Sequence, residues 1–314
     1  RNLGRSLLHQ GARDPHDVYV VELSSFQLEN MYQFKANIAV MMNITPDHLD
    51  RYDHKMEGYI QAKFRILNNL TPQDAFIFWH DDPVIQAQLR KVITEATMYP
   101  FAERLEPGIA AYVDDDDQLV FNTPRTSFSM PRADLALNGL HNLYNSMAAG
   151  LSACLLDIRR EDIRRALSNF EGVEHRLEYI DTIGGVKWIN DSKATNVNSC
   201  WYALESMPQS GVVLILGGKD KGNDYSEILP LVRSKVKGIV AMGKDNSKII
   251  DFFSGEVSQI VDTHSLEDAV NACAEMATEG DTVLLSPCCA SFDLFSSYED
   301  RGRKFKAAVR ALKA

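Results

Sequence analysis

The 314-residue sequence has little of several features that would point to other classes of protein. Its longest apolar runs, such as NIAVMM and VVLIL, fall well short of the roughly 20 residues that span a bilayer. Five cysteines without a CxxC spacing indicate neither a disulfide framework nor a zinc site. With 33 basic against 43 acidic residues, the net charge of -10 disfavours nucleic acid and anionic membranes as partners. These absences favour a globular protein of the reducing cytoplasm.

The first residues, RNLGRSLLHQGARDP, contain neither a starting Met nor the apolar core of a signal peptide. We therefore expect the sequence to begin inside a longer protein. Its length and its hydrophobic content of 45% suffice for two domains, each with a core of its own. Short apolar runs alternate with amphipathic stretches, which is typical of an α/β fold around a mostly parallel sheet. We expect one domain over residues 1–172 and another over 173–314, with a hinge near Gly172.

The first domain is expected to contain strands over residues 17–23, 36–44 and 75–80. The segment from Gly108 to Arg132 instead predicts strands joined by turns, an antiparallel addition whose tip is DDDDQ. Helices are expected over 141–157 and 161–170, the second of which begins with acidic residues that suit a helix N-terminus.

The second domain begins with a predicted hairpin over residues 176–191, in which Gly184 and Gly185 form the turn. The strands VVLILGG, GIVAMG and DTVLLSP follow with helices between them, and a basic helix begins near Ser297. This order of elements predicts a doubly wound, Rossmann-like sheet.

Two loops of the first domain carry candidate ligands. Glu22 lies at the C-terminal end of the predicted strand over 17–23, where open α/β sheets place binding groups, and is a candidate Mg²⁺ ligand. Its alternative role is to cap a helix that starts near Ser24. In NITPDHLDRY, Asp47, His48 and Asp50 could hold a divalent metal or a polar substrate, whereas the alternative is a structural histidine.

Lys63 lies where a core residue is expected. In the helix predicted around EGYIQAKFRILNN, Met56, Tyr59, Ile66 and Leu70 form one stripe, and Lys63 occupies its middle. Such a lysine usually extends its ammonium group to water. If it is desolvated instead, its pKa falls, and the neutral amine can react with carbon dioxide to form a carbamate that offers oxygen to Mg²⁺.

The motif GLHNLYN places Asn142 and Asn145 on one helix face, where both could touch one ligand, although capping by Asn142 is the alternative. NDSKATN directly precedes a predicted helix, so backbone N–H groups and Lys193 could receive an anion. In LGGKDKG, paired glycines follow a strand and precede Lys219 and Lys221, so this loop could also receive an anion. The alternative is a tight turn with solvated lysines.

The segment LLSPCCASFDLF follows the last predicted strand and offers Ser291 and Phe292. Its adjacent cysteines, Cys288 and Cys289, suggest a nucleophile. We reject that role because no histidine lies nearby in the sequence and small buried thiols are common.

Eight motifs occur together in one order along nearly the whole sequence: VELSSFQLE, NITPDHLDRY, the Lys63 helix, GLHNLYN, EHRLEYI, NDSKATN, LGGKDKG and LLSPCCASFDLF. In this order and spacing they resemble the Mur ligase family, and within it the branch that uses D-glutamate. The resemblance implies an ATP-dependent, ADP-forming ligase of peptidoglycan synthesis, with ATP and Mg²⁺ as cofactors. It would add D-glutamate to UDP-N-acetylmuramoyl-L-alanine through an acyl phosphate, as a cytoplasmic monomer. The implied architecture is a central ATPase-type domain, incomplete at its N-terminus, followed by a Rossmann-like C-terminal domain.

The resemblance also assigns residues by motif. It implies a metal site formed by Glu22, His48 and Lys63, with Lys63 carbamylated. It implies His48, Lys63 and Lys193 as the catalytic residues. It implies ATP contacts from Asn142, Asn145, Arg176 and Asp191. It implies substrate contacts from Asn2, Ser24, Gln27, Thr195, Lys221, Ser291, Phe292 and Tyr298.

One departure concerns the family's Gly-rich phosphate loop, GTNGKT or similar, which is absent from these residues. Without its backbone amides and lysine the triphosphate lacks its cradle, so the resemblance implies that these 314 residues alone are inactive. Two other interpretations stay open. One is another Mur-type or folylpolyglutamate-type ligase with a different C-terminal pocket. The other is a non-catalytic nucleotide-binding scaffold.

Overall fold

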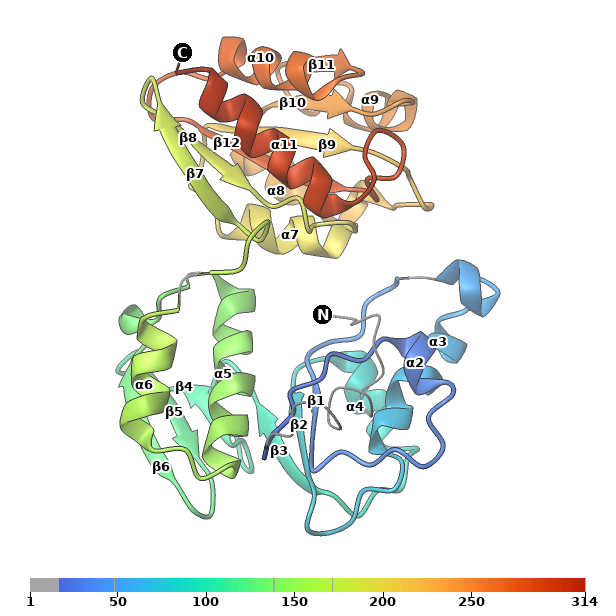
Figure 1. Cartoon of the computed structure of the whole chain (residues 1–314), viewed down its shortest axis with the longest axis vertical. Coiled ribbons are helices and arrows are strands. Elements are labelled where there is room, and N and C mark those ends of the chain that lie inside the picture. Colours follow the sequence, from blue (N-terminus) through green and yellow to red (C-terminus); the bar gives the residue numbers. More distant parts are fainter. Residues whose placement is uncertain (1–16, 48, 138, 171, 314) are drawn as a thin grey trace. The chain divides into compact units, whose positions relative to one another are not determined.

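The computed structural model describes residues 17–47, 49–137, 139–170 and 172–313, which form two compact units (Figure 1). The first unit comprises the chain up to Asp134 together with Tyr144–Arg165. The second comprises Leu135–Leu143 and the chain from Ala166 onwards. The domain boundary and the hinge near Gly172 stay predictions.

The sheet of the first unit has six strands that lie side by side in the order of the sequence. They are β1 Ile38–Met41, β2 Ala75–Trp79, β3 Thr97–Phe101, β4 Ala111–Val113, β5 Gln118–Asn122 and β6 Ser127–Pro131. Strands β1 to β4 run parallel, and β4 to β6 form the predicted antiparallel addition. Strand β3 was not expected, because Pro100 within TMYPF is unusual in a strand.

Helices cover this sheet: α2 Ser25–Leu28, α3 Met56–Phe64, α4 Pro83–Leu89, α5 Leu140–Leu155 and α6 Arg160–Ser168, with short 3₁₀ turns η1 Leu49–Tyr52, η2 Arg65–Leu67 and η3 Arg132–Asp134. The predicted stripe of α3 is confirmed as a core face, since Tyr59 and Leu70 are buried in one apolar cluster against which Met56 and Ile66 pack. The helix is shorter than expected, because it passes into the 3₁₀ turn η2 after Phe64.

The strand predicted over residues 17–23 is wrong. Residues 18–23 lie outside every strand in the described part of the chain, and Val20 is 97% exposed. An apolar run becomes a strand only when a neighbouring strand takes up its backbone hydrogen bonds. Glu22 therefore does not lie at the end of a strand in this structure.

The sheet of the second unit has the strand order β11-β10-β9-β12-β8-β7. The strands are β7 Glu178–Ile183, β8 Val186–Asn190, β9 Val212–Gly217, β10 Val236–Met242, β11 Ile260–Thr263 and β12 Thr282–Cys288. Strand β7 pairs antiparallel with β8 as the predicted hairpin, and the other neighbouring strands pair parallel. The predicted α/β class is confirmed for both units, whereas the short edge strand β11 was missed.

Helices lie on both faces of this second sheet (Figure 1). They are α7 Val197–Glu205, α8 Leu229–Lys235, α9 Ser247–Phe253, α10 Leu266–Met276 and α11 Tyr298–Ala311, with the turn η4 Tyr225–Glu227. Because side chains alternate along a strand, Leu214 of β9 packs with α7, α8 and α9, while Val213 and Ile215 pack with α10 and α11. Burial of β9 on both faces explains why VVLILG is apolar throughout.

Two glycines bring the end of β9 close to its neighbours. Gly217 has φ +131°, and a Cβ built there would lie 2.3 Å from the carbonyl oxygen of Met242. Gly218 has φ +127°, and its Cβ would lie 2.4 Å from the carbonyl oxygen of Ala290. Only glycine fits both the backbone angles and this spacing. The loop after β9 is thereby held against the loops after β10 and β12.

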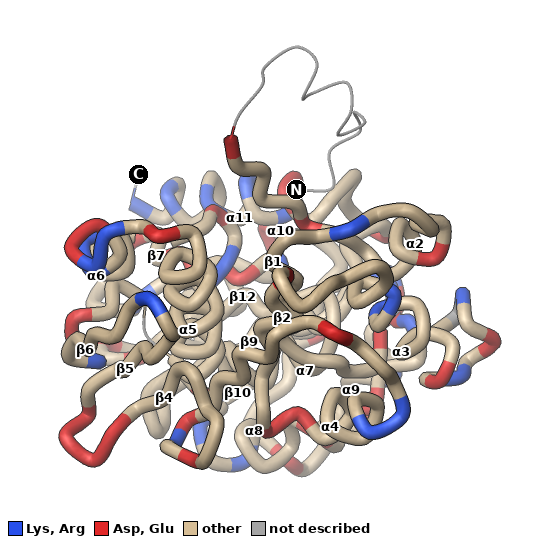
Figure 2. The backbone as a smooth tube through the Cα atoms, turned by 90° about the horizontal axis from the view of Figure 1, so that it is seen from below, with Lys and Arg blue, Asp and Glu red and all other residues tan. Residues whose placement is uncertain are grey.

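Basic and acidic residues are interspersed along the chain without forming large regions of one sign. The exception is the acidic turn between β4 and β5 (Figure 2). That turn contains the run Asp114–Asp117, as the tip DDDDQ predicted. Among the described residues, no helix combines the length and the apolarity that crossing a membrane requires.

Candidate active site

Most predicted site residues of the second unit lie just beyond the carboxyl ends of neighbouring parallel strands. Strand β12 lies between β8 and β9 and pairs parallel with both. The residues that follow these three strands therefore meet at one edge, which is where open α/β sheets bind ligands. They include Asp191, Lys193, Thr195, Lys219, Lys221, Ser291 and Phe292.

Asp191 is buried directly after β8. The Ser286 hydroxyl donates to its Oδ2 at 2.8 Å, and the Leu177 N–H donates to its Oδ1 at 3.3 Å. Burial nevertheless raises the pKa of Asp191 to about 7, although these donors and the nearby Arg176 and Arg301 favour its charged form. A buried carboxyl group at a sheet edge with a pKa near neutral pH is typical of a functional site.

Asp191→Asn is expected to stabilise the chain at pH 8 but not at pH 4. The folded pKa of about 7 lies above the ordinary value of 3.8, so between these values the folded chain keeps a proton that the unfolded chain loses. Wild-type stability should therefore fall as the pH rises from 4 to 7, by an order of a few kcal/mol, and asparagine removes this loss. Urea unfolding at several pH values measures the effect. The exposed Asp251→Asn is the control, and parallel curves for wild type and Asp191→Asn would contradict the prediction.

Lys193 is held two residues beyond Asp191. Its backbone N–H donates to the His175 carbonyl oxygen at 3.0 Å, and its Nζ lies 4.3 Å from the centre of the Tyr298 ring. An ammonium group over an aromatic face is attracted to the ring and keeps its charge. Of the predicted D-glutamate residues, the structure thus brings Lys193 and Tyr298 into direct contact. Thr195 follows two residues later, before Asn196, whose side chain caps α7.

Two of the predicted ATP residues, Arg176 and Asp191, lie close together in the second unit. Arg176 is close enough to Asp191 to favour the charged carboxylate. His141, in the first turn of α5, is near Arg176 as well, and its ring lies 5.7 Å from that of Tyr202. Because α5 begins at Leu140, Asn142 lies inside its first turn and the capping alternative does not hold. Asn145 is one turn further along the same helix.

The remaining residues of this edge differ in exposure. Ser291 is buried, whereas Phe292 is 68% exposed. Lys219 and Lys221 both carry exposed side chains, and the Lys219 N–H donates to the Ala290 carbonyl oxygen at 2.8 Å. Which of the two lysines faces D-glutamate stays a prediction.

The two adjacent cysteines agree with the rejection of a nucleophile. Cys288 and Cys289 are buried, and burial raises the pKa of Cys289 to about 11 and that of Cys288 further. Their thiolate forms are therefore disfavoured at neutral pH.

In the first unit, Lys63 lies in the last turn of α3 and is partly buried. Burial lowers the pKa of its amine, while the nearby carboxylates of Asp47 and Asp82 oppose that shift. Asp82, three residues beyond the apolar strand β2, was not predicted, although an acid soon after a strand was a usable signal. Asp82 caps α4, and its Oδ2 accepts the Ile44 N–H at 3.0 Å. Asp82 thereby connects the segment after β1 to the start of α4.

Two other predicted residues of this unit lie at the start of helix α2. Ser24 and Gln27 form a capping box at α2, in which the Gln27 N–H donates to Ser24 Oγ at 3.3 Å. Ser24 therefore caps this helix, and Glu22 does not. Asn2 and His48 lie outside the described residues, so the convergence of Glu22, His48 and Lys63 stays a prediction.

The donor chemistry around Lys63 suits Mg²⁺ in part. Mg²⁺ prefers oxygen ligands, which the carboxylates of Asp47 and Asp82 supply. The amine of Lys63 would need conversion to a carbamate before it could offer oxygen. Its lowered pKa favours the neutral amine that this conversion requires.

Another cluster of possible metal ligands lies in the second unit, but two of its carboxylates already pair with a lysine ammonium. Ligand atoms of Glu174, His175 and Glu178 lie within 4.8 Å of one another. However, Lys306 Nζ already binds Glu174 and Glu178, the latter at 2.8 Å. The Asn190 amide donates to His175 Nδ1 at 3.0 Å, which leaves the ring proton on Nε2. This group therefore connects elements of the fold.

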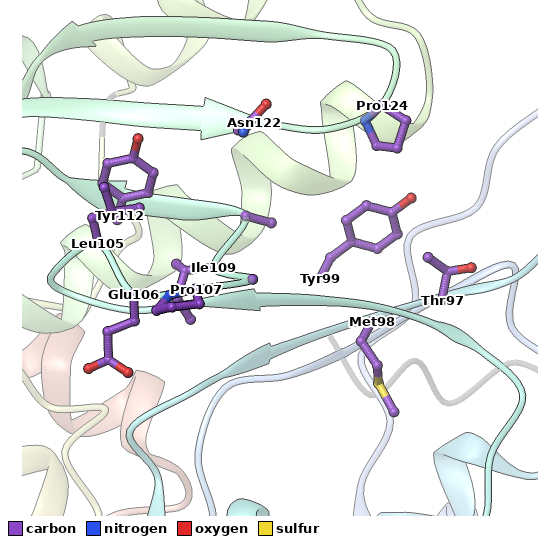
Figure 3. Close-up of a pocket in the computed structure, with 12 residues that line it drawn as sticks. Thr97, Met98, Tyr99, Leu105, Glu106, Pro107, Ile109, Tyr112, Asn122 and Pro124 are labelled. Atoms are coloured by element: carbon purple, nitrogen blue, oxygen red, sulfur yellow. The ribbon is translucent and has the colours of Figure 1, made fainter.

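A hollow of about 680 Å³ lies elsewhere in the first unit, where β3 and β4 diverge after their single residue pair (Figure 3). Tyr99 of β3, Tyr112 of β4 and Pro124 beyond β5 line it. None of the predicted site residues contributes to its lining, so its position does not support a catalytic role.

The amino-acid sequence matches one family of known proteins along most of its length. Residues 4–153 match the Mur ligase middle domain, and residues 175–289 match the Mur ligase, glutamate ligase domain. The UDP-N-acetylmuramoylalanine--D-glutamate ligase of Bacteroides fragilis is 58% identical over 312 residues, which are 99% of this chain and 70% of that protein. The chain belongs to the Mur ligase family. Its eight motifs and the predicted ligase class are thereby confirmed at the level of this family.

Solved structures share the Mur ligase fold at lower identity. A crystal structure of MurF from Acinetobacter baumannii has a TM-score of 0.65 and 20% identity, and covers 88% of this chain. The MurF ligase of Thermotoga maritima in complex with ADP has a TM-score of 0.64 and 14% identity over a similar 88%. The chain spans 60% and 63% of the lengths of these two structures. At such identities the comparison supports the two-domain α/β fold alone.

Proposed function

We propose that this Mur ligase chain takes part in adding D-glutamate to UDP-N-acetylmuramoyl-L-alanine, with conversion of ATP to ADP. The observation that carries the proposal is 58% identity, over 99% of the chain, to a ligase named for this reaction. An ADP-bound relative with the same fold supports the use of ATP.

The proposed reaction has two steps. The terminal phosphoryl group of ATP passes to the carboxylate of the muramoyl-alanine, which forms an acyl phosphate and releases ADP. The amine of D-glutamate then attacks the acyl carbon, and phosphate leaves as the amide forms. The physical difficulty is repulsion between anions, which positive groups at the sheet edge must offset.

The described residues divide this task between them. Arg176 and Asp191, which lie close together, would contact ATP, and so would Asn142 and Asn145 on helix α5. Lys193 would pair with a carboxylate of D-glutamate, next to Tyr298, Thr195, Lys221, Ser291 and Phe292. Ser24 and Gln27 would contact the muramoyl substrate, as would Asn2.

Mg²⁺ would be held by Glu22, His48 and a carbamate on Lys63, and when bound it supplies neutralisation of phosphate charge. The burial of Lys63 supports this assignment, because burial favours the uncharged amine from which a carbamate forms.

Release of ADP that depends on the amino acid tests the proposed function. The full gene product should release ADP with D-glutamate but not with L-lysine, meso-diaminopimelate or L-alanine, given ATP, Mg²⁺ and UDP-N-acetylmuramoyl-L-alanine. If the protein prefers another amino acid, D-glutamate is not its substrate, and the result favours another Mur-type ligase. ATP binding without amide formation would favour the non-catalytic scaffold. The 314-residue chain, assayed in parallel, is expected to be inactive because it lacks a GxxGK[ST] loop.

We also propose a cytoplasmic monomer. The five cysteines are buried and form no disulfide, which agrees with a reducing compartment. Sedimentation of the full gene product tests the monomer, and a stable dimer would contradict it.

A further inference from the structure

Arg301 is a fully buried arginine near the start of α11, with an exposed fraction of 0%. A buried guanidinium group destabilises a fold unless its donors are paired. Here Nε donates to Ser192 Oγ at 2.9 Å, and one terminal nitrogen donates to the Ser192 carbonyl oxygen at 2.8 Å. Both terminal nitrogens also donate to the Cys289 carbonyl oxygen, at 3.2 and 3.3 Å. The guanidinium group thus acts on two backbone carbonyls and one hydroxyl.

These acceptors belong to the two loops that carry the proposed D-glutamate residues. Ser192 directly precedes Lys193 after β8, and Cys289 lies two residues before Ser291 after β12. The Ser192 hydroxyl accepts from Arg301 and donates to the Tyr298 carbonyl oxygen at 2.8 Å, which adds α11 to the same network. One side chain therefore joins three segments that are far apart in the sequence.

We propose that Arg301 is a positioning residue for amino-acid binding, which sets the spacing between Lys193 and Ser291. This inference rests on the proposed function, because it takes that pocket as the D-glutamate site. Arg301 touches no reacting atom, and it acts through Ser192 and Cys289.

The planar fork of arginine explains why this position requires it. The N–H donors of the guanidinium group lie in one plane and reach Ser192 and Cys289 together, whereas a lysine ammonium keeps the charge on a flexible stem without that geometry. Arg301→Lys should therefore preserve the charge and loosen the spacing of the two loops.

The test is a comparison of KM values in the full gene product. Arg301→Lys is expected to raise the KM for D-glutamate by roughly 10- to 100-fold, because displacement of a binding group by about 1 Å has effects of this size. The KM for ATP should change less than the KM for D-glutamate. Arg303→Lys, two residues along the same helix and exposed, is the matched control and should leave both KM values unchanged.

Ser192→Ala provides an independent variant, since it keeps the guanidinium group and removes only the hydroxyl that accepts from Arg301 and donates to the Tyr298 carbonyl oxygen. It should raise the KM for D-glutamate in the same direction but by less, and its effect should not add fully to that of Arg301→Lys. Should Arg301→Lys fail to fold, Ser192→Ala decides alone. Equal changes in both KM values, or a lower unfolding midpoint with unchanged KM values, would overturn the inference.

The wild-type assay separates this inference from the proposed function. If wild type shows no response to D-glutamate, the proposed substrate is wrong. The KM comparison is then made with the amino acid that it accepts. A selective rise for that amino acid in Arg301→Lys still supports the positioning role, and its absence rejects it.

Discussion

Lys63→Ala is expected to reduce turnover of the full gene product by at least roughly 1000-fold, the upper range for loss of one preorganised electrostatic group. Lys63 is partly buried in the last turn of α3, and burial lowers the pKa of its amine. The neutral amine can form a carbamate, whose oxygens would serve the metal site. Alanine removes this possibility without introducing a new charge.

Short carboxylic acids should restore part of the activity of Lys63→Ala, because their oxygens can enter the vacated space. Steady-state rates with increasing formate or acetate measure this rescue. Lys55→Ala is the control, since Lys55 is exposed at the start of the same helix. Its rate should match wild type and should not rise with added acid. Full activity of Lys63→Ala without acid would refute the role of the lysine.

Lys193→Ala is expected to lower kcat/KM for D-glutamate by roughly 100- to 1000-fold, as expected when one partner of a desolvated charge pair is truncated. Lys193 Nζ lies against the Tyr298 ring, at the edge where β8 and β12 end. Alanine carries no charge, so a carboxylate of D-glutamate would lose its partner there. Initial rates at varied D-glutamate measure the change.

Two further measurements separate binding from folding in Lys193→Ala. The KM for ATP should change much less than the KM for D-glutamate, and the unfolding midpoint should stay near that of wild type. Lys187→Ala, an exposed lysine on the same strand β8, should retain full activity. Equal kcat/KM values for Lys193→Ala and wild type would exclude Lys193 from the D-glutamate pocket.

Much of the fold was accessible from local patterns. Turn chemistry and alternation depend on residues close together in the chain, so the hairpin at Gly184 and Gly185 and the antiparallel strands beyond Gly108 were predicted correctly. Edge strands were less accessible, because their stability depends on a neighbour. Strand β11 was missed for this reason, and the apolar run over 17–23 was wrongly predicted as a strand.

The sequence by itself determined the family, the α/β class and the segments that carry polar groups, because each motif is a short stretch of adjacent residues. Only the tertiary structure decided which of these groups meet and in what state of charge. Asp191 acquires its raised pKa from burial, and its hydrogen-bond donor Ser286 is 95 residues away. Arg301 binds Ser192 across 109 residues. Burial and long-range pairing arise when distant strands align at one edge, and no local pattern records them.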